Sequence, residues 1–424
     1  MTGPMTDAPR TRDRSRPHDI VLWGATGFTG QLVAEVLVRT RSRGELRLAL
    51  AGRSRSKLEA LRDRLARIDP AATALPLLLA DSHDRASLDA MAAQAEVVCT
   101  TVGPYARHGA PLVAACVEQQ TDYCDLTGEV TFIRPMIDAH HATARARGVR
   151  IVCCCGFDSI PSDIGTLMLQ RAMQERHGVA AREVKLAVVR SKGSASGGTI
   201  ASMIEMMRTL QRDPPARALI ADPYGLDPEG ERNGPDGRDR MGASYDADLG
   251  GWTGPFVMAA VNTRVVRRSN ALLGYPYGRD FRYQEVVRFS SGVGGMARAW
   301  GMAVGITGAL AALTVPPVRD LLTRFVLPAP GEGPSEEQRE AGYFEIELFG
   351  RGAGPDAPVL RGRVAAHKDP GYGATALMLA EAARCLAVDG PTLPSPGGVL
   401  TPASAMGDAL LPRLREAGLE FEVR

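Results

Sequence analysis

Three glycines spaced three residues apart, Gly24, Gly27 and Gly30, are the residues whose types and order most directly suggest chemistry. They follow the apolar run 20–23 and precede a helix-like segment, so that strand, tight turn and helix start come in succession. Gly24 permits a sharp turn, Gly27 lets a pyrophosphate approach the backbone, and Gly30 lets the helix lie close to the strand. Because free N–H groups at a helix start favour an anion, the pattern predicts a dinucleotide site.

The end of the second strand indicates which dinucleotide binds. The apolar run 46–51 ends in Gly52 and Arg53, at a place where NAD-binding chains usually carry an acidic side chain. Arg53, followed by Ser54, Arg55 and Lys57, offers a guanidinium and neighbouring donors to a 2′-phosphate. The predicted cofactor is therefore NADP(H). The alternative is that Arg53 and Lys57 are solvated charges at a helix start.

Two further strand ends carry candidate residues. Asp81 follows a short apolar run and either accepts a hydrogen bond from the adenine amine or caps the next helix. Gly103 and Pro104 follow a β-branched run, and we expect their backbone to lie against the cofactor ribose. Tyr105 comes next and either donates a proton, holds a carbonyl or serves packing alone.

Polar residues also gather at the two strand ends that follow. Asp125 and Glu129 are placed to act as acid, base or substrate anchor, or to cap the helix expected over 131–147. The predicted strand 150–155 opens into residues 156–163, which combine turn formers with polar side chains. Such a loop favours a site over a simple connector, although the same residues would also start a helix.

Length and charge bound the class of protein. The 424 residues exceed one ordinary core and predict two domains, and the net charge of +2, from 50 basic and 48 acidic side chains, leaves no nucleic-acid footprint. No signal peptide is recognisable, so we expect a cytoplasmic protein. The predicted organisation is a disordered leader (1–18), a Rossmann domain (19–160), a second domain (161–385) containing a long surface loop (214–247), and a C-terminal segment (386–424) that packs back on the Rossmann domain.

The seven cysteines include the run Cys153, Cys154 and Cys155. Adjacent side chains on a strand point to opposite faces, so these three cannot converge on one metal ion. We therefore expect reduced, buried thiols, with neither a metal site nor a disulfide framework.

One uncharged stretch, Ala299–Val318, lies between Arg298 and Arg319 and is long enough to span a membrane. Three glycines dilute it and the Pro316–Pro317 pair ends it. We therefore favour an acyl-contacting or membrane-surface helix, or a core helix, over a true span.

Several motifs together resemble one family. They are GATGFTG at 24–30, AGR at 51–53, GPYARHG at 103–109, DLTGE at 125–129, CGFDSIPSD at 155–163, GYGATALMLAEAARCLA at 371–387 and GGVLTPASAMGDAL at 397–410. With these motifs the chain resembles the saccharopine dehydrogenase-like oxidoreductases, and within them the bacterial trans-acting enoyl reductases, over almost all of its length beyond the leader.

The resemblance implies an α/β protein, with a Rossmann-type doubly wound parallel sheet and a second mixed α/β domain. It also implies reduction of an acyl-chain double bond on a partner polyketide synthase, and it transfers no catalytic residue. An amino-acid dehydrogenase of saccharopine type and a non-catalytic NADP-binding scaffold on lipid or a synthase remain alternatives. The cofactor residues that carry over are Gly24, Thr26, Gly27, Phe28, Thr29, Gly30 and Arg53.

A polar cluster beyond residue 252 completes the candidate residues. Asn262, Arg264, Arg267 and Arg268 lie in an apolar segment and could hold a carbonyl, a carboxylate or a carrier phosphate. Alternation fits a strand with Asn262 and Arg264 on one face, which leaves the other two as exposed charges.

Reduction of an enoyl thioester requires a hydride at the β-carbon, donors for the enolate oxygen and a proton at the α-carbon. The donors that we assign to this chemistry from the sequence are Tyr105, Ser159, Asn262 and Arg264. Neither the acyl chain nor the oligomeric state follows from the sequence.

Overall fold

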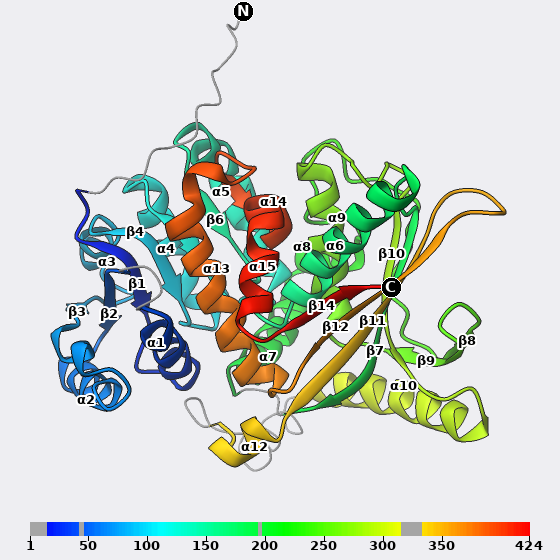
Figure 1. Ribbon diagram of the computed structural model, residues 1–424, viewed down its shortest axis with the longest axis horizontal. Helices are drawn as coiled ribbons and strands as arrows, with labels where there is room; N and C mark the ends of the chain where they lie inside the picture. Colours follow the sequence, from blue (N-terminus) through cyan, green and yellow to red (C-terminus); the bar gives the residue numbers. More distant parts are fainter. Residues whose placement is uncertain (1–14, 42–45, 194–196, 315–332) are drawn as a thin grey trace, which may run out of the picture.

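Two seven-stranded sheets organise the computed structural model, which describes residues 15–41, 46–193, 197–314 and 333–424 (Figure 1). Sheet A has the order β13-β6-β5-β4-β1-β2-β3 and sheet B the order β14-β12-β11-β7-β10-β9-β8. The two sheets correspond to the predicted Rossmann domain and second mixed domain.

Sheet A is parallel throughout. Its order reverses between β1 and β4, and ligands of doubly wound folds bind at the carboxyl edge beside such a reversal. The strands are β1 (His18–Trp23), β2 (Leu48–Gly52), β3 (Leu77–Leu79), β4 (Ala95–Thr100), β5 (Asp122–Cys124), β6 (Arg150–Val152) and β13 (Gly398–Leu400).

Helices cover both faces of sheet A because its strands are apolar on both sides. In β1, Ile20 and Leu22 join one core, whereas Val21 and Trp23 join the other. One face carries α1 (Phe28–Arg41), α2 (Arg55–Leu65) and α13 (Thr375–Asp389), and the other carries α3 (Arg85–Ala92), α4 (Tyr105–Glu118) and α5 (Val130–Ala146).

Sheet B is mixed, since β7 pairs parallel with β10 while its other pairings are antiparallel. The long helices α6 (Ile160–His177) and α9 (Ala259–Leu272) pack against it. Its strands are β7 (Glu183–Lys192), β8 (Ser244–Asp246), β9 (Gly251–Pro255), β10 (Arg282–Arg288), β11 (Tyr343–Arg351), β12 (Val359–Ala366) and β14 (Glu420–Val423).

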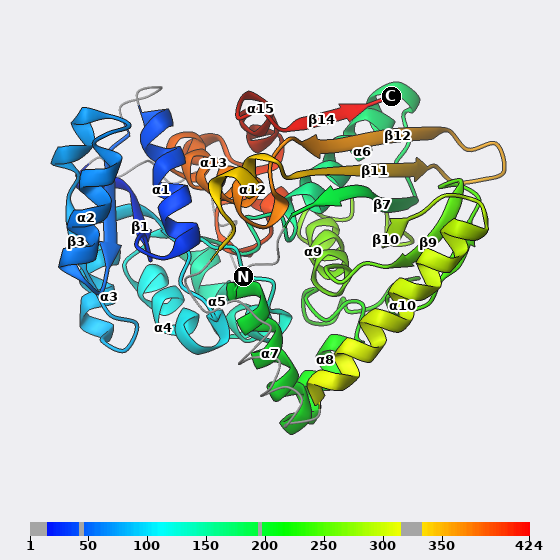
Figure 2. The ribbon, with the colours of Figure 1, turned by 90° about the horizontal axis from the view of Figure 1, so that it is seen from below.

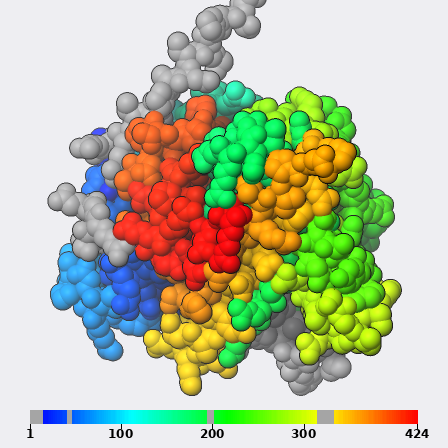
Figure 3. Space-filling view, turned by 45° about the vertical axis from the view of Figure 1, so that its right-hand side comes forward, coloured from blue at the N-terminus to red at the C-terminus, as the bar shows by residue number. Residues whose placement is uncertain are grey.

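The C-terminal segment contributes to both sheets. After α13, the chain adds β13 to sheet A, passes through α14 (Pro402–Met406) and α15 (Leu410–Glu416), and adds β14 to sheet B. In the space-filling view these red residues lie between the blue N-terminal part and the orange and green strands of sheet B (Figure 3). The structure thus differs from the predicted boundaries, because α13 lies on sheet A and the segment 386–424 serves both halves.

Two other predicted segments also differ from the structure. Residues 1–14 of the expected leader lie outside the described residues, but β1 already begins at His18. The expected surface loop 214–247 contains α8 (Pro214–Ala221) and β8, and Leu226 within it is buried.

The apolar stretch forms part of α10 (Val293–Thr314), and residues 315–318 lie outside the described residues. Figure 2 shows α10 below sheet B, with its C-terminal end near α8 and α7 (Gly197–Arg212). By length and composition, Val293–Leu313 is the one helix in the described ranges that could cross a membrane, and 11% of its most apolar window is buried.

Candidate active site

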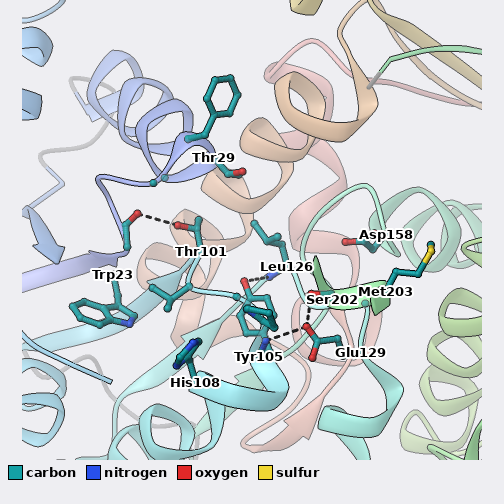
Figure 4. Close-up of a pocket in the computed structure, with 18 of the residues that line it drawn as sticks. Trp23, Thr29, Thr101, Tyr105, His108, Leu126, Glu129, Asp158, Ser202 and Met203 are labelled. Atoms are coloured by element: carbon teal, nitrogen blue, oxygen red, sulfur yellow. Dashed lines mark hydrogen bonds between the residues drawn. The ribbon is translucent and has the colours of Figure 1, made fainter. Parts of the chain in front are cut away.

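A cavity of about 550 Å³ opens at the carboxyl edge of sheet A, beside the order reversal (Figure 4). Its wall comes from the glycine loop, the ends of β2 and β4, the turns after β5 and β6, and helices α7 and α9. Ten of the twelve residues predicted to hold the cofactor line it: Gly24, Thr26, Gly27, Phe28, Thr29, Gly30, Arg53, Lys57, Gly103 and Pro104.

The glycine loop is built as the sequence suggests. Gly24 has φ +82°, a backbone conformation that side chains disfavour. A Cβ on Gly30 would lie 2.2 Å from the carbonyl oxygen of Gly24, so only glycine allows α1 to start this close to the turn. The Thr101 hydroxyl donates to the same Gly24 carbonyl at 3.2 Å, which ties the loop to the end of β4.

The basic end of the cavity has free donors. The guanidinium of Arg53 and the ammonium of Lys57 make no hydrogen bond or ion pair with any other described residue, and both side chains are exposed. Unpaired cations beside a glycine loop suit a phosphate group.

Ser54 and Asp81, which were also predicted to hold the cofactor, are not among the residues that line the cavity. The Ser54 hydroxyl caps α2 by accepting from the N–H of Lys57. The Asp81 carboxylate accepts from the N–H of His83 at 2.9 Å, so it serves the local turn, and its neighbour Ser82 lines the cavity in its place.

Tyr105 reaches the cavity wall but its hydroxyl is committed elsewhere. It is the first residue of α4 and only 3% exposed. Its hydroxyl donates to the carbonyl of Thr100 at 3.2 Å and accepts from the N–H of Leu126 at 3.4 Å. Burial, followed by the nearby Asp125 carboxylate, raises its pKa well above the usual value. Tyr105 therefore braces two strand ends and is poorly placed to give up a proton.

The other three predicted catalytic residues lie behind the cavity and do not line it. The segment containing Asn262 and Arg264 is the helix α9, not a strand, and it is enclosed on most sides. The buried Ser159 hydroxyl donates to Asn262 Oδ1 at 3.0 Å, and Asn262 Nδ2 donates to Glu285 at 2.8 Å. Arg264 binds Asp239 at 2.6 Å. These residues join α9 to its neighbours and position the site without touching it.

Arg267 and Arg268, expected to be exposed, are buried as well. Arg267 donates to Asp236 and to the carbonyl of Pro223, and Arg268 donates to the carbonyls of Leu226 and Val399. Because Asp236, Pro223 and Leu226 lie in the segment expected as a surface loop, the arginines explain why that segment is held against the protein.

Glu129 connects the start of α4 with α7 across the site. Its carboxylate accepts from the N–H groups of Tyr105 at 3.0 Å and Ala106 at 2.8 Å, at the start of α4. It also accepts from the Ser202 hydroxyl of α7 at 2.6 Å, as the dashed lines in Figure 4 show. This carboxylate therefore fixes α7 over the cavity. The role weighed for Glu129 as a cap of the helix over 131–147 is not seen, because its side chain makes no cap hydrogen bond to α5 and binds the start of α4 instead.

Asp158 was not among the residues predicted from the sequence, but it also lines the cavity, from the turn between β6 and α6. Burial, with a smaller contribution from Asp125, raises the pKa of its carboxyl to about 7. Figure 4 places it at the end of the cavity near Ser202 and Met203. The polar loop 156–163 was the available signal, but the pattern does not say which of its side chains faces a ligand.

The end of the cavity near Asp158, Ser202 and Met203 is otherwise apolar. Three of its seven apolar residues are methionines, whose flexible thioethers adapt to chains of different shape. The apolar residues contributed by α7, α8 and the start of α9 are Met203, Met206, Ile220, Val257, Met258, Ala260 and Val261. Met203 and Met206 are three residues apart in the sequence, a spacing that places two side chains on one face of a helix.

Comparison with known proteins agrees with this geometry. Residues 20–152 match the saccharopine dehydrogenase NADP-binding domain. The fold matches yeast saccharopine dehydrogenase (L-Glu forming) with a TM-score of 0.52 and 12% identity, covering 96% of this chain and 99% of that one. The class is thus an NADP-binding oxidoreductase with a saccharopine dehydrogenase fold.

Relatives in mycobacteria narrow the class further. A protein of Mycobacterium tuberculosis (strain H37Rv), provisionally named a trans-acting enoyl reductase, is 46% identical over 417 residues, covering 96% of this chain and 97% of its own. Trans-acting enoyl reductases of Mycobacterium bovis and Mycobacterium ulcerans are 44% and 42% identical, each covering 95% of this chain and 97% of their own length. The chain belongs to the trans-acting enoyl reductase family.

The residues at the cavity fit NADP(H). The glycine loop leaves room that side chains would fill, and Arg53 with Lys57 supplies unpaired cations for a phosphate. In the described residues no cluster of His, Cys, Asp and Glu is placed to hold a metal ion, and all seven cysteines are buried free thiols.

Proposed function

We propose that this protein is an NADPH-dependent enoyl reductase that acts in trans on an acyl thioester, whose carrier is a domain of a separate polyketide synthase. One observation carries the proposal: a single cavity joins the glycine loop to an apolar end that contains Met203, Met206 and Met258. We call the part beside the glycine loop the cofactor end and the apolar part the acyl end. The first part suits a dinucleotide and the second suits an acyl chain. The names of the mycobacterial relatives support the same reaction.

Bound NADPH would supply the hydride for the β-carbon of the substrate. The chain's own residues would bind the cofactor and the acyl chain and orient them toward each other. The glycine loop holds the pyrophosphate, Arg53 pairs with the 2′-phosphate, and the apolar end excludes water from the acyl chain. Because Arg53 is a fixed cation without an acidic partner in the described ranges, it should favour NADPH over NADH.

The experiment is a fluorescence titration with NADPH and NADH, followed by assays of NADPH consumption with trans-2-enoyl thioesters of N-acetylcysteamine. The Arg53→Glu variant should bind NADPH about 10- to 100-fold more weakly, because a charge-assisted contact is worth about 1.5–3 kcal/mol. NADH binding should change little. Arg55→Glu, in the same helix start, is the matched control. Failure of the wild type to bind either nucleotide would refute the proposal.

The saccharopine-type alternative is less well supported. An amino-acid substrate with several carboxylates needs cations beside it, yet the apolar end contains no Lys or Arg among its described residues. Turnover of saccharopine but of no enoyl thioester would favour this alternative, and nucleotide binding without any turnover would favour the scaffold.

We propose that the protein is located in the cytoplasm and binds to a membrane surface through α10. Val293, Trp300 and Val304 on this helix are 77%, 51% and 67% exposed. The helix carries Arg298 and no acidic residue, and it packs against α7, which lines the cavity. An exposed apolar helix with a Trp suits a lipid interface, and this contact would bring the acyl end of the cavity close to lipid.

Sedimentation with vesicles of phosphatidylcholine and phosphatidylglycerol tests the membrane contact. Trp300→Asp should lower the bound fraction several-fold, since both buried area and interfacial anchoring are lost. Val388→Asp, an exposed apolar site on α13, should change nothing. Equal sedimentation of wild type and Trp300→Asp would contradict the proposal and direct attention to a protein partner.

A further inference from the structure

Asp158 lines the acyl end of the cavity, near Ser202 and Met203 (Figure 4). The turn that carries it follows β6, at the same sheet edge as the glycine loop. A Cβ built on Gly128 would lie 3.6 Å from Met258 Cε and 3.8 Å from Asp158 Oδ1. The missing side chain at Gly128 therefore leaves space into which both the Met258 thioether and the Asp158 carboxyl project. This arrangement puts an acid beside apolar surface within the cavity.

Four other polar groups of the wall, those of Tyr105, Ser202, Glu129 and Thr101, are already engaged. The hydroxyls of Tyr105 and Ser202 donate to Thr100 and Glu129. Glu129 itself accepts from two backbone N–H groups and from the Ser202 hydroxyl. The Thr101 hydroxyl donates to the glycine loop. None of these groups is free to give a proton to a bound substrate.

Asp158, in contrast, has no hydrogen bond or ion pair with any residue in the described ranges. The nearby titratable groups are Asp125, Glu129 and the thiol of Cys154, and none of them is a cation. Burial in these surroundings raises the pKa of Asp158 to about 7, so a large fraction carries its proton near neutral pH.

We propose that Asp158 is the catalytic acid that protonates the substrate at its α-carbon. This proposal rests on the proposed enoyl reductase function. Hydride addition forms the bond at the β-carbon, and the π electrons of the double bond move toward the thioester to give an enolate. The enolate electron pair then takes the Asp158 proton and forms the new bond at the α-carbon. Asp158 is left as a carboxylate and regains its proton from water.

The test compares wild type with Asp158→Asn, which keeps the shape and loses the acid. The kcat for a trans-2-enoyl N-acetylcysteamine thioester should fall about 10²- to 10⁴-fold, the usual contribution of a general acid. NADPH affinity should stay within about two-fold, since the residue lies outside the glycine loop. In the wild type, kcat should fall as pH rises through about 7, because deprotonation removes the acid, and this limb should vanish in the variant.

A stereochemical readout separates a chemical role from a structural one. In D₂O the wild type should place deuterium on one face of the α-carbon, whereas solvent should deuterate the enolate from both faces in Asp158→Asn. Asp158→Glu, which retains an acid, should recover part of kcat and the single-face labelling. If Asp158→Asn does not fold, the Asp158→Glu variant still tests the proposal through a displaced pH limb.

Asp163→Asn is the matched control. Burial raises the pKa of Asp163 to about 7 as well, but this carboxylate binds Ser269 and the N–H of Ala403 away from the cavity. Its variant should lose thermal stability and keep both the pH limb and the labelling pattern. Unchanged kcat, pH profile and labelling in Asp158→Asn would overturn the assignment of Asp158 alone. A wild type that reduces no enoyl thioester would remove the proposed function and this proposal with it.

Discussion

The two ends of the cavity achieve binding in opposite ways. The cofactor end uses a glycine turn that leaves space beside the backbone, and Arg53 supplies a positive charge. The acyl end uses side chains that are mostly apolar, with Asp158 as an acid whose protonation depends on burial. A dinucleotide has a fixed shape and fixed charges, which a rigid turn can match, whereas an acyl chain varies in length and needs an adaptable wall.

The ends also differ in how they are assembled. The glycine loop is one contiguous run at a strand end, held by the neighbouring Thr101. The acyl end is built from α7, α8 and α9, and it depends on the bridge from Glu129 to Ser202 for its position. Loss of one side chain should therefore affect the two ends differently, and variants can separate them.

The largest effect on NADPH affinity is expected from Gly30→Val, which disrupts the glycine loop at the cofactor end. A Cβ there would lie 2.2 Å from the Gly24 carbonyl oxygen, so the turn and α1 must separate. NADPH affinity should fall by at least about 100-fold, or roughly 2.7 kcal/mol. Gly301→Ala is the control, because a Cβ at Gly301 meets open space. Fluorescence titration of both variants measures the difference, and normal NADPH binding by Gly30→Val would break the comparison.

A smaller and selective effect is expected from Met206→Glu, which places a charge in the acyl end. The kcat/KM for a long-chain enoyl thioester should fall about 10-fold, since burying a carboxylate against the acyl chain is costly. The short crotonyl thioester should be affected less, and NADPH affinity should not change. Met206→Leu should behave as wild type. A variant that loses NADPH binding instead would mean that the two ends are not separable.

The smallest effect is expected from Tyr105→Phe, which tests a brace between the ends. Removal of the hydroxyl breaks its hydrogen bonds with Thr100 and Leu126. The free energy of unfolding should fall by about 1 kcal/mol, while kcat stays within about three-fold. Denaturant unfolding and steady-state kinetics measure the two quantities. A kcat lowered by orders of magnitude would restore Tyr105 as a catalytic residue.

The sequence was informative where function depends on a contiguous run. Gly24 to Gly30 and Arg53 could be placed because a βαβ unit fixes their geometry locally. The polar ends of β5 and β6 also pointed to the right sheet edge, without saying that Asp158 faces the cavity and Ser159 faces away.

The sequence was misleading where a helix is enclosed on most sides. Because α9 buries polar residues around most of its circumference, it has no apolar stripe with a helical period, and its short alternation imitates a strand. Arg267 and Arg268 are buried because carbonyls and a carboxylate from the segment 222–240 accept their hydrogen bonds. These partners lie far from the two arginines in the sequence. No local pattern reports such contacts.

The return of the C-terminal segment has a consequence for synthesis. Sheet A receives β13 and sheet B receives β14 from the last part of the chain, and Arg268 and Asp163 then bond to that part through Val399 and Ala403. During translation, neither sheet can be complete until residues 398–423 have left the ribosome. Until then β6 and β12 are exposed as edge strands, and edge strands can pair with other chains.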